Sequence, residues 1–114
     1  MTSPRRISWV KAARRDFEAF PESVRSDVLD ALTLVALGAM PAKAKPLTGI
    51  EGGVFEIALR HRTDAFRAVY AIRIDRDVWV VHAFQKKSKS RIATPKHEID
   101  VIRERLKRLR EALA

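Results

Sequence analysis

The sequence predicts an α+β domain in which an N-terminal helical hairpin and a C-terminal helix pack on a small antiparallel β-sheet. Three observations predict this fold. Apolar residues recur every three or four positions between residues 10 and 35, as in helices. They alternate with other residues between 55 and 84, as in strands. Helical spacing then returns from 99 to 113, and the whole chain, residues 1–114, is expected to form one domain.

The first helical pattern is short and ends at Pro21, which can also open the next helix. Residues 7–10 before it are either an edge strand or the approach to the helix. The second pattern closes at Gly38, which is expected to cap the helix. The apolar positions of the two helices are Val10, Ala13, Phe17 and Phe20, then Val24, Val28, Leu32 and Val35.

Residues 40–53 are rich in proline and glycine and are expected to form a loop. Strands are expected over 55–60, 66–74 and 78–84. The turns between them are short, which favours an antiparallel meander. The third strand is nearly all apolar and is therefore expected to be central.

The last helix has a start signal and one apolar stripe. Thr94 is expected to be its N-cap and Pro95 its first helical residue. The stripe consists of Ile99, Ile102, Leu106, Leu109 and Leu113, and the other faces carry mostly arginine and lysine.

The chain is strongly basic, with 23 Lys and Arg against 14 Asp and Glu, a net charge of +9. Nucleic acid is the first candidate partner, ahead of an anionic membrane surface or an acidic protein. The absence of cysteine excludes disulfides, a Cys-ligated zinc site and a thiol nucleophile. No metal-ligand spacing and no phosphate-binding glycine loop occurs, so neither metal nor cofactor is expected. Without a membrane span or signal peptide, we expect a cytoplasmic protein.

The period of two predicts which side chains share a face of the sheet. If Phe55, Ile57 and Leu59 face the core, Glu56 and Arg60 face the other side. Arg67 on the next strand faces that side too. Arg60 and Arg67 are then near neighbours beside the connecting turn. From the sequence alone, two solvated arginines on an ordinary polar face are the favoured interpretation.

The end of the third strand adds more positive charge. Either Lys86 or Lys87 must point to the arginine face, and Lys87 does so if Trp79, Val81 and Ala83 lie on that face. A cluster of Arg60, Arg67 and Lys87 can hold a phosphodiester and stabilise the charge of its transition state. The candidate RNA contacts around it are Lys45, Lys89, Arg91 and Trp79, the last as a stacking platform. A basic loop that only keeps the protein soluble is the alternative.

The three histidines have different expected roles. His82 lies in an apolar strand and is expected to be a hydrogen-bonded core residue. His97 lies beside the basic loop and can contact a phosphate or act as an acid or base. His61 is expected to be solvated in a turn.

Taken together, six blocks of this sequence resemble the phage-derived branch of the RelE/HigB toxin family. The blocks are KAKPL at 43–47, Gly49, VFEI at 54–57, FRAVY at 66–70, HAFQKKS at 82–88 and TPK at 94–96, before a basic C-terminal helix. The resemblance implies a RelE/ParE-like α+β fold.

The resemblance also implies a function. RelE and HigB relatives are toxins of type II toxin–antitoxin systems that cleave mRNA on the ribosome and so inhibit translation. They use no metal, and the substrate's 2′-hydroxyl attacks the adjacent phosphate. A cognate antitoxin, often a helix-turn-helix protein, neutralises the toxin. Two alternatives stay open, namely a ParE-like toxin that inhibits DNA gyrase and a decayed module that only binds nucleic acid.

Residue by residue, the resemblance assigns Arg67 to the scissile phosphate and Lys87 to the position of a late catalytic arginine. Because the face of Arg67 is expected to be on the solvent side, loss of Arg67 is expected to abolish toxicity while leaving folding intact. Glu56 and Ala58 stand where RelE has two lysines, and RelE's C-terminal tyrosine has no counterpart, because Tyr70 is the only tyrosine here. The general base is therefore open between His97, Lys86 and Glu56.

Overall fold

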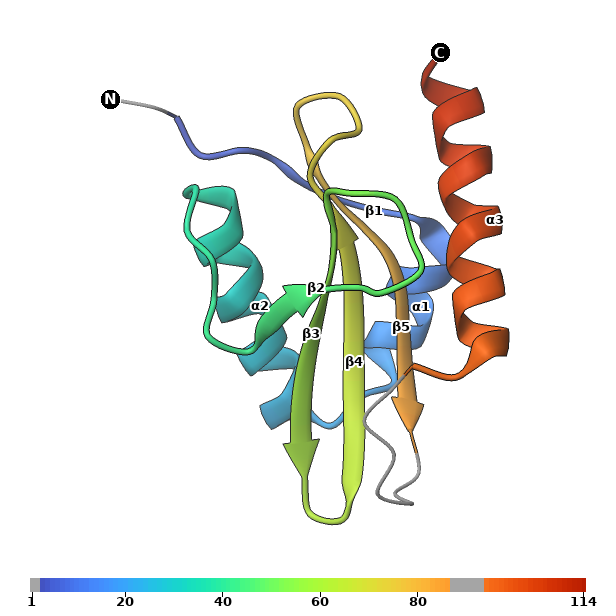
Figure 1. The fold of residues 1–114 in the computed structure, drawn as a ribbon. Coiled ribbons are helices and arrows are strands. Elements are labelled where there is room, and N and C mark those ends of the chain that lie inside the picture. Colours follow the sequence, from blue (N-terminus) through green and yellow to red (C-terminus); the bar gives the residue numbers. More distant parts are fainter. Residues whose placement is uncertain (1–2, 87–93) are drawn as a thin grey trace.

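The computed structural model describes residues 3–86 and 94–114. In these ranges the chain forms a five-stranded sheet and three helices (Figure 1). The strands lie in the order β1-β5-β4-β3-β2. The elements are β1 (Ile7–Trp9), α1 (Lys11–Glu18), α2 (Glu22–Ala36), β2 (Ala44–Pro46), β3 (Val54–His61), β4 (Asp64–Ala71), β5 (Val78–Lys86) and α3 (Lys96–Leu113).

The predicted antiparallel meander is confirmed as β3, β4 and β5. Two short edge strands extend it. β1 pairs with β5 in parallel, which decides between the two readings of residues 7–10. β2 pairs antiparallel with β3 inside the stretch expected to be a loop. A three-residue strand is too short to show an alternating pattern, and its pairing depends on a distant partner. β5 lies inside the sheet, but the middle strand is β4.

Both faces of the sheet are covered, which the sequence analysis did not predict. α1 and α2 pack on one face, where Phe17, Val28 and Leu32 meet Ile57 and Tyr70. α3 packs on the other face in a second apolar cluster (Figure 1). That cluster joins sheet residues Val54, Val69, Ala71 and Val81 to Ile102, Leu106 and Leu109 of α3.

The helical hairpin forms as predicted, with α1 and α2 separated by only three residues. Gly38 ends α2 with a φ of 91°, a conformation that favours glycine. The Gly38 N–H donates to the Val35 carbonyl at 2.9 Å, and the Ala39 N–H donates to that of Leu34. These bonds satisfy carbonyls that the helix end leaves open. None of the helices in residues 3–86 and 94–114 is long and apolar enough to cross a membrane.

Candidate functional site

The end of the sheet that carries the β3–β4 turn extends beyond the first turn of α3 (Figure 1). The register aligns Arg60 of β3 with Ala65 of β4 and Lys86 of β5. The next row aligns Ala58, Arg67 and Phe84. Because side chains alternate along a strand, Arg60, Arg67 and Lys86 all lie on the face that α3 covers further along. The predicted common face of Arg60 and Arg67 is therefore confirmed.

The two arginines differ in exposure. Arg60 is exposed, whereas Arg67 retains only 7% of its accessible surface. Arg67 Nη1 donates to Glu56 Oε1 at 2.7 Å, and Glu56 is 2% exposed. The expectation that Arg67 lies exposed to solvent is wrong, because its side chain is buried against Glu56. The alternating pattern identified the face correctly but could not show that Thr94 and α3 would cover part of it.

Thr94 connects this pair to the start of α3. Its hydroxyl donates to Glu56 Oε2, so the carboxylate accepts hydrogen bonds at both oxygens. The prediction that Thr94 caps α3 is wrong, since Pro95 occupies the N-cap position without a side-chain cap. Glu56 provides a stronger acceptor for the hydroxyl because it carries a full negative charge. The sequence gives no signal for this bond, which joins residues 38 positions apart.

A β-bulge changes which lysine joins the arginine face. Val69 pairs with His82 while Tyr70 pairs with Val80, which leaves Val81 as an extra residue in β5. Trp79 and Val81 lie on the α3 side, but after the bulge Ala83 faces the opposite side, and Lys86 shares the face of Arg67. Lys87 was expected on the arginine face only if Trp79, Val81 and Ala83 all lay there, and the bulge breaks that condition at Ala83. Lys87, Lys89 and Arg91 themselves lie outside the described residues.

Lys45 is exposed on β2 directly opposite Glu56. A pocket opens between them and the start of α3, and Glu56 forms part of its wall. Its lining residues are Lys45, Pro46, Leu47, Thr48, Glu56, Thr94 and Ile99. The structure therefore places Lys45 at the same site as the Glu56–Arg67 pair.

His82 is buried, which confirms its predicted core role. Its Nδ1 lies 2.9 Å from Arg105 Nη1 and its Nε2 lies 2.7 Å from Glu98 Oε1. Because a guanidinium only donates, Nδ1 is the acceptor, and the neutral ring carries its proton on Nε2. Burial, aided by the charge of Arg105, lowers the pKa of His82, although Glu98 and Asp16 oppose this. The neutral imidazole thus attaches α3 to β5.

The structure does not bring the remaining candidates into contact with the Glu56–Arg67 pair. His97 is largely exposed, and its Nε2 lies 3.4 Å from Glu98 Oε2. Trp79 shares the predicted face and lies opposite Ala71, two residues along β4 from Val69, the partner of Glu56. It lies six residues along β4 from the row of Arg60 and Lys86, a separation of about 20 Å. Its partly buried side chain packs against the apolar cluster beneath α3. Tyr70 is buried on the other face, as predicted.

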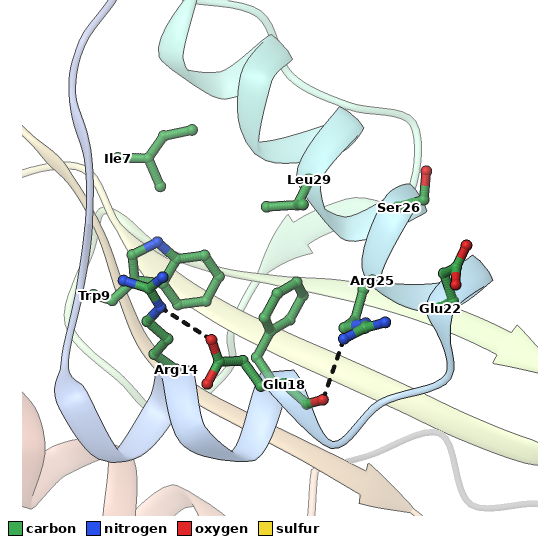
Figure 2. A pocket seen from close by; sticks show the side chains of 9 residues that line it. Ile7, Trp9, Arg14, Glu18, Glu22, Arg25, Ser26 and Leu29 are labelled. Atoms are coloured by element: carbon green, nitrogen blue, oxygen red, sulfur yellow. Dashed lines mark hydrogen bonds and ion pairs between the residues drawn. The ribbon is translucent and has the colours of Figure 1, made fainter.

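A second pocket lies on the opposite layer, between α1, α2 and β1 (Figure 2). Figure 2 shows Arg14 and Arg25 both directed toward Glu18, and Arg25 donates to the Glu18 carbonyl at 3.4 Å. No residue predicted for the site lines this pocket. Within the part of the chain that the structure describes, no group of three or more His, Asp or Glu side chains is arranged to hold a metal ion.

The site thus combines a buried, doubly hydrogen-bonded carboxylate with cationic side chains at the open end of a covered sheet. A held carboxylate of this kind can accept a proton. Exposed cations beside it can bind a phosphodiester and stabilise the charge that develops during its cleavage. The arrangement therefore suits acid–base chemistry on a polyanion.

Comparison with solved structures places the fold in the RelE class of toxins. A mutant of E. coli toxin RelE in the free state is similar, with a TM-score of 0.62 and 18% identity over 93% of this chain and 98% of that chain. The toxin–antitoxin complex RelBE2 from Mycobacterium tuberculosis is also similar, with a TM-score of 0.50 and 21% identity over 77% of this chain and 98% of the matched chain. At these identities the likeness establishes the fold.

The family is established by sequence. The profile described as "Phage derived protein Gp49-like (DUF891)" matches residues 15–107. The chain therefore belongs to the phage-derived Gp49-like family, a family of RelE-type toxins, as the resemblance implied. No curated protein matches this chain.

Proposed function

We propose that this toxin is an endoribonuclease that cleaves mRNA on the ribosome without a metal ion. One observation carries the proposal. Glu56 is buried at the wall of a pocket, and Arg67 and Thr94 hold its carboxylate. Lys45 lies directly opposite it on β2, and Arg60 and Lys86 lie further along the same face of a RelE-type fold.

Glu56 is the general base in this proposal. It accepts the proton of the substrate's 2′-hydroxyl as the 2′-oxygen forms a bond to phosphorus. Arg67 orients the carboxylate through the hydrogen bond of 2.7 Å from its Nη1 to Glu56 Oε1. Among His97, Lys86 and Glu56, the proposal takes Glu56 because it is buried and lines a pocket.

The phosphate contact then belongs to the accessible cations. Arg60 is exposed in the row that also contains Lys86, so both can face a phosphodiester beside Arg67. The bond from phosphorus to the 5′-oxygen breaks, and that oxygen takes a proton from a cationic donor. Lys86 and His97 are the candidate donors among the described residues. The products are a 2′,3′-cyclic phosphate and a 5′-hydroxyl.

The proposed partners follow from the same class. The similar structure from M. tuberculosis is a toxin–antitoxin complex. We propose that a cognate antitoxin, of helix-turn-helix type as the resemblance implies, neutralises this toxin too. The ribosome and its mRNA are the proposed targets, which suits the net charge of +9.

Purified ribosomes programmed with a defined mRNA test this proposal. The wild-type protein should cut the mRNA and leave 2′,3′-cyclic phosphate ends. Glu56→Gln, which keeps the side chain's shape, should lower the cleavage rate by roughly 100-fold or more. Glu22→Gln, the same change at an exposed position of α2, is the matched control. Full activity of Glu56→Gln would exclude Glu56 as the base, and gyrase inhibition without cleavage would replace the proposal by a ParE-like function.

A further inference from the structure

The pocket beside Glu56 is larger than a proton-transfer site requires. Its volume is about 470 Å³, within the range of small-molecule sites. It lies between β2, the residues that follow β2, and the start of α3. Because Glu56 forms one wall, a nucleotide whose ribose lies at the carboxylate has room for its base in the same pocket.

The lining divides into apolar and polar parts. Pro46, Leu47 and Ile99 provide apolar surface against which a flat ring can pack. Lys45 and Thr48 are exposed at the rim and offer hydrogen-bond donors. Apolar walls with a few placed polar groups are what a nucleobase requires, since every base has a flat face and a polar edge.

Lys45 also indicates which nucleobase the pocket favours. A lysine ammonium only donates, so it favours an edge that carries acceptors. Guanine presents two, N7 and O6, and lysine is a common partner of that edge. Adenine replaces O6 by an amino donor, which Lys45 cannot accept.

We propose that this pocket binds the base of the nucleotide whose 2′-hydroxyl attacks, and that Lys45 makes it prefer guanine over adenine. The inference rests on the proposed ribonuclease function, because that function places the attacking ribose at Glu56. It assigns base recognition on the 5′ side of the cut to β2 and the first turn of α3.

Cleavage of a programmed mRNA library, read by sequencing the new ends, tests the preference. Wild type should favour guanine immediately 5′ of the cut. Lys45→Met, which keeps the stem, should reduce the guanine-to-adenine ratio roughly fivefold to tenfold. Lys43→Met removes the same charge from a residue that lines a different pocket, and should leave the ratio unchanged. An unchanged ratio in Lys45→Met would overturn the assignment.

A direct binding measurement separates this inference from the proposed function. Guanosine 3′-monophosphate is titrated into the protein while NMR signals of Thr48 and Ile99 are followed. Thr48→Trp, which places an indole at the rim, should abolish the shifts, whereas Thr33→Trp, an exposed threonine on α2, should not. NMR shift changes without RNA cleavage would support the base pocket and contradict the proposed nuclease function. RNA cleavage without NMR shift changes and without a base preference would contradict base binding in the pocket and support the proposed nuclease function.

Discussion

Arg67 and Glu56 depend on each other, because both side chains are buried and carry opposite charges 2.7 Å apart. Removing one partner leaves the other as an uncompensated buried charge. We therefore predict that Arg67→Ala lowers the free energy of unfolding by about 3–5 kcal/mol, measured by urea denaturation. Arg60→Ala, on the same face but exposed, should change it by less than about 0.5 kcal/mol. Equal, small effects of both changes would show that Arg67 is not buried with its partner.

Tyr70 offers a second test at the scale of a single residue, since it is the only tyrosine in the chain. Burial raises its pKa from 10.0 to about 12, and its ring stacks on Phe55. The ultraviolet titration of the folded protein should therefore have its midpoint near 12. Because the pKa of Tyr70 is higher in the folded state, the contribution of its neutral hydroxyl to the free energy of unfolding is complete below pH 10. That contribution is lost as pH rises toward 12. A midpoint near 10 would mean that Tyr70 is exposed to solvent.

At the scale of elements, the contact between β5 and α3 depends on a neutral histidine. The folded-state pKa of His82 lies below its ordinary value of 6.5, so the unfolded chain binds more protons just below pH 6.5. Stability should therefore fall as pH decreases from 6.5 toward the lowered pKa. Protonation would also put an N–H on Nδ1 opposite the Arg105 donor.

Chemical denaturation between pH 5 and 8 measures this dependence. His82→Gln should lessen the loss of stability at acid pH, because the buried titrating group is gone. His61→Gln, at the turn between β3 and β4, should keep the wild-type slope. A steep acid loss that persists in His82→Gln would assign the pH dependence to other groups.

The sequence predicted the elements with strong periodicity and missed features that depend on distant partners. The three helices and the β3–β5 meander follow from local patterns of apolar residues. β2, the hydrogen bond from Thr94 to Glu56 and the two bonds of His82 each join segments far apart in the chain. The bulge at Val81 reversed the expected side of every later residue in β5, because one extra residue shifts the alternation.

The candidate site was predicted in part for the same reason. Alternation placed Arg60, Arg67 and Glu56 on one face, as the register confirms. It could not show that Arg67 is paired with Glu56 in the interior, because a strand pattern contains no information about what covers that face. Trp79 shared the face but not the end of the sheet.

At the scale of the whole molecule, charge is distributed unevenly. The exposed side of α2 carries Glu22, Asp27 and Asp30, whereas α3 carries many exposed basic residues. The exposed basic side chains of α3 include Lys96, Arg103, Lys107, Arg108 and Arg110. Several of these α3 charges are paired with acids: Lys96 and Arg103 with Asp100, Arg108 with Glu104 and Arg110 with Glu51. A polyanion is therefore expected to approach the face of the sheet that carries Lys45, Arg60 and Lys86, where the site opens.

This distribution predicts a steep dependence of ribosome and RNA binding on salt. Each phosphate contact releases counterions, so six to ten contacts would weaken binding roughly 10³- to 10⁵-fold between about 50 and 200 mM salt. Binding isotherms at a series of salt concentrations measure the slope. A flat response would contradict phosphate contact by the basic side chains.

The mapping of mRNA 5′ ends after induced expression in bacteria tests the central claim most directly. Wild type should arrest growth and generate new 5′-hydroxyl ends in translated mRNAs. Glu56→Gln, expressed as folded protein at the same level, should produce neither, while Glu22→Gln behaves as wild type. Growth arrest without new ends, or the same ends in Glu56→Gln, would contradict cleavage by the carboxylate that Arg67 and Thr94 hold.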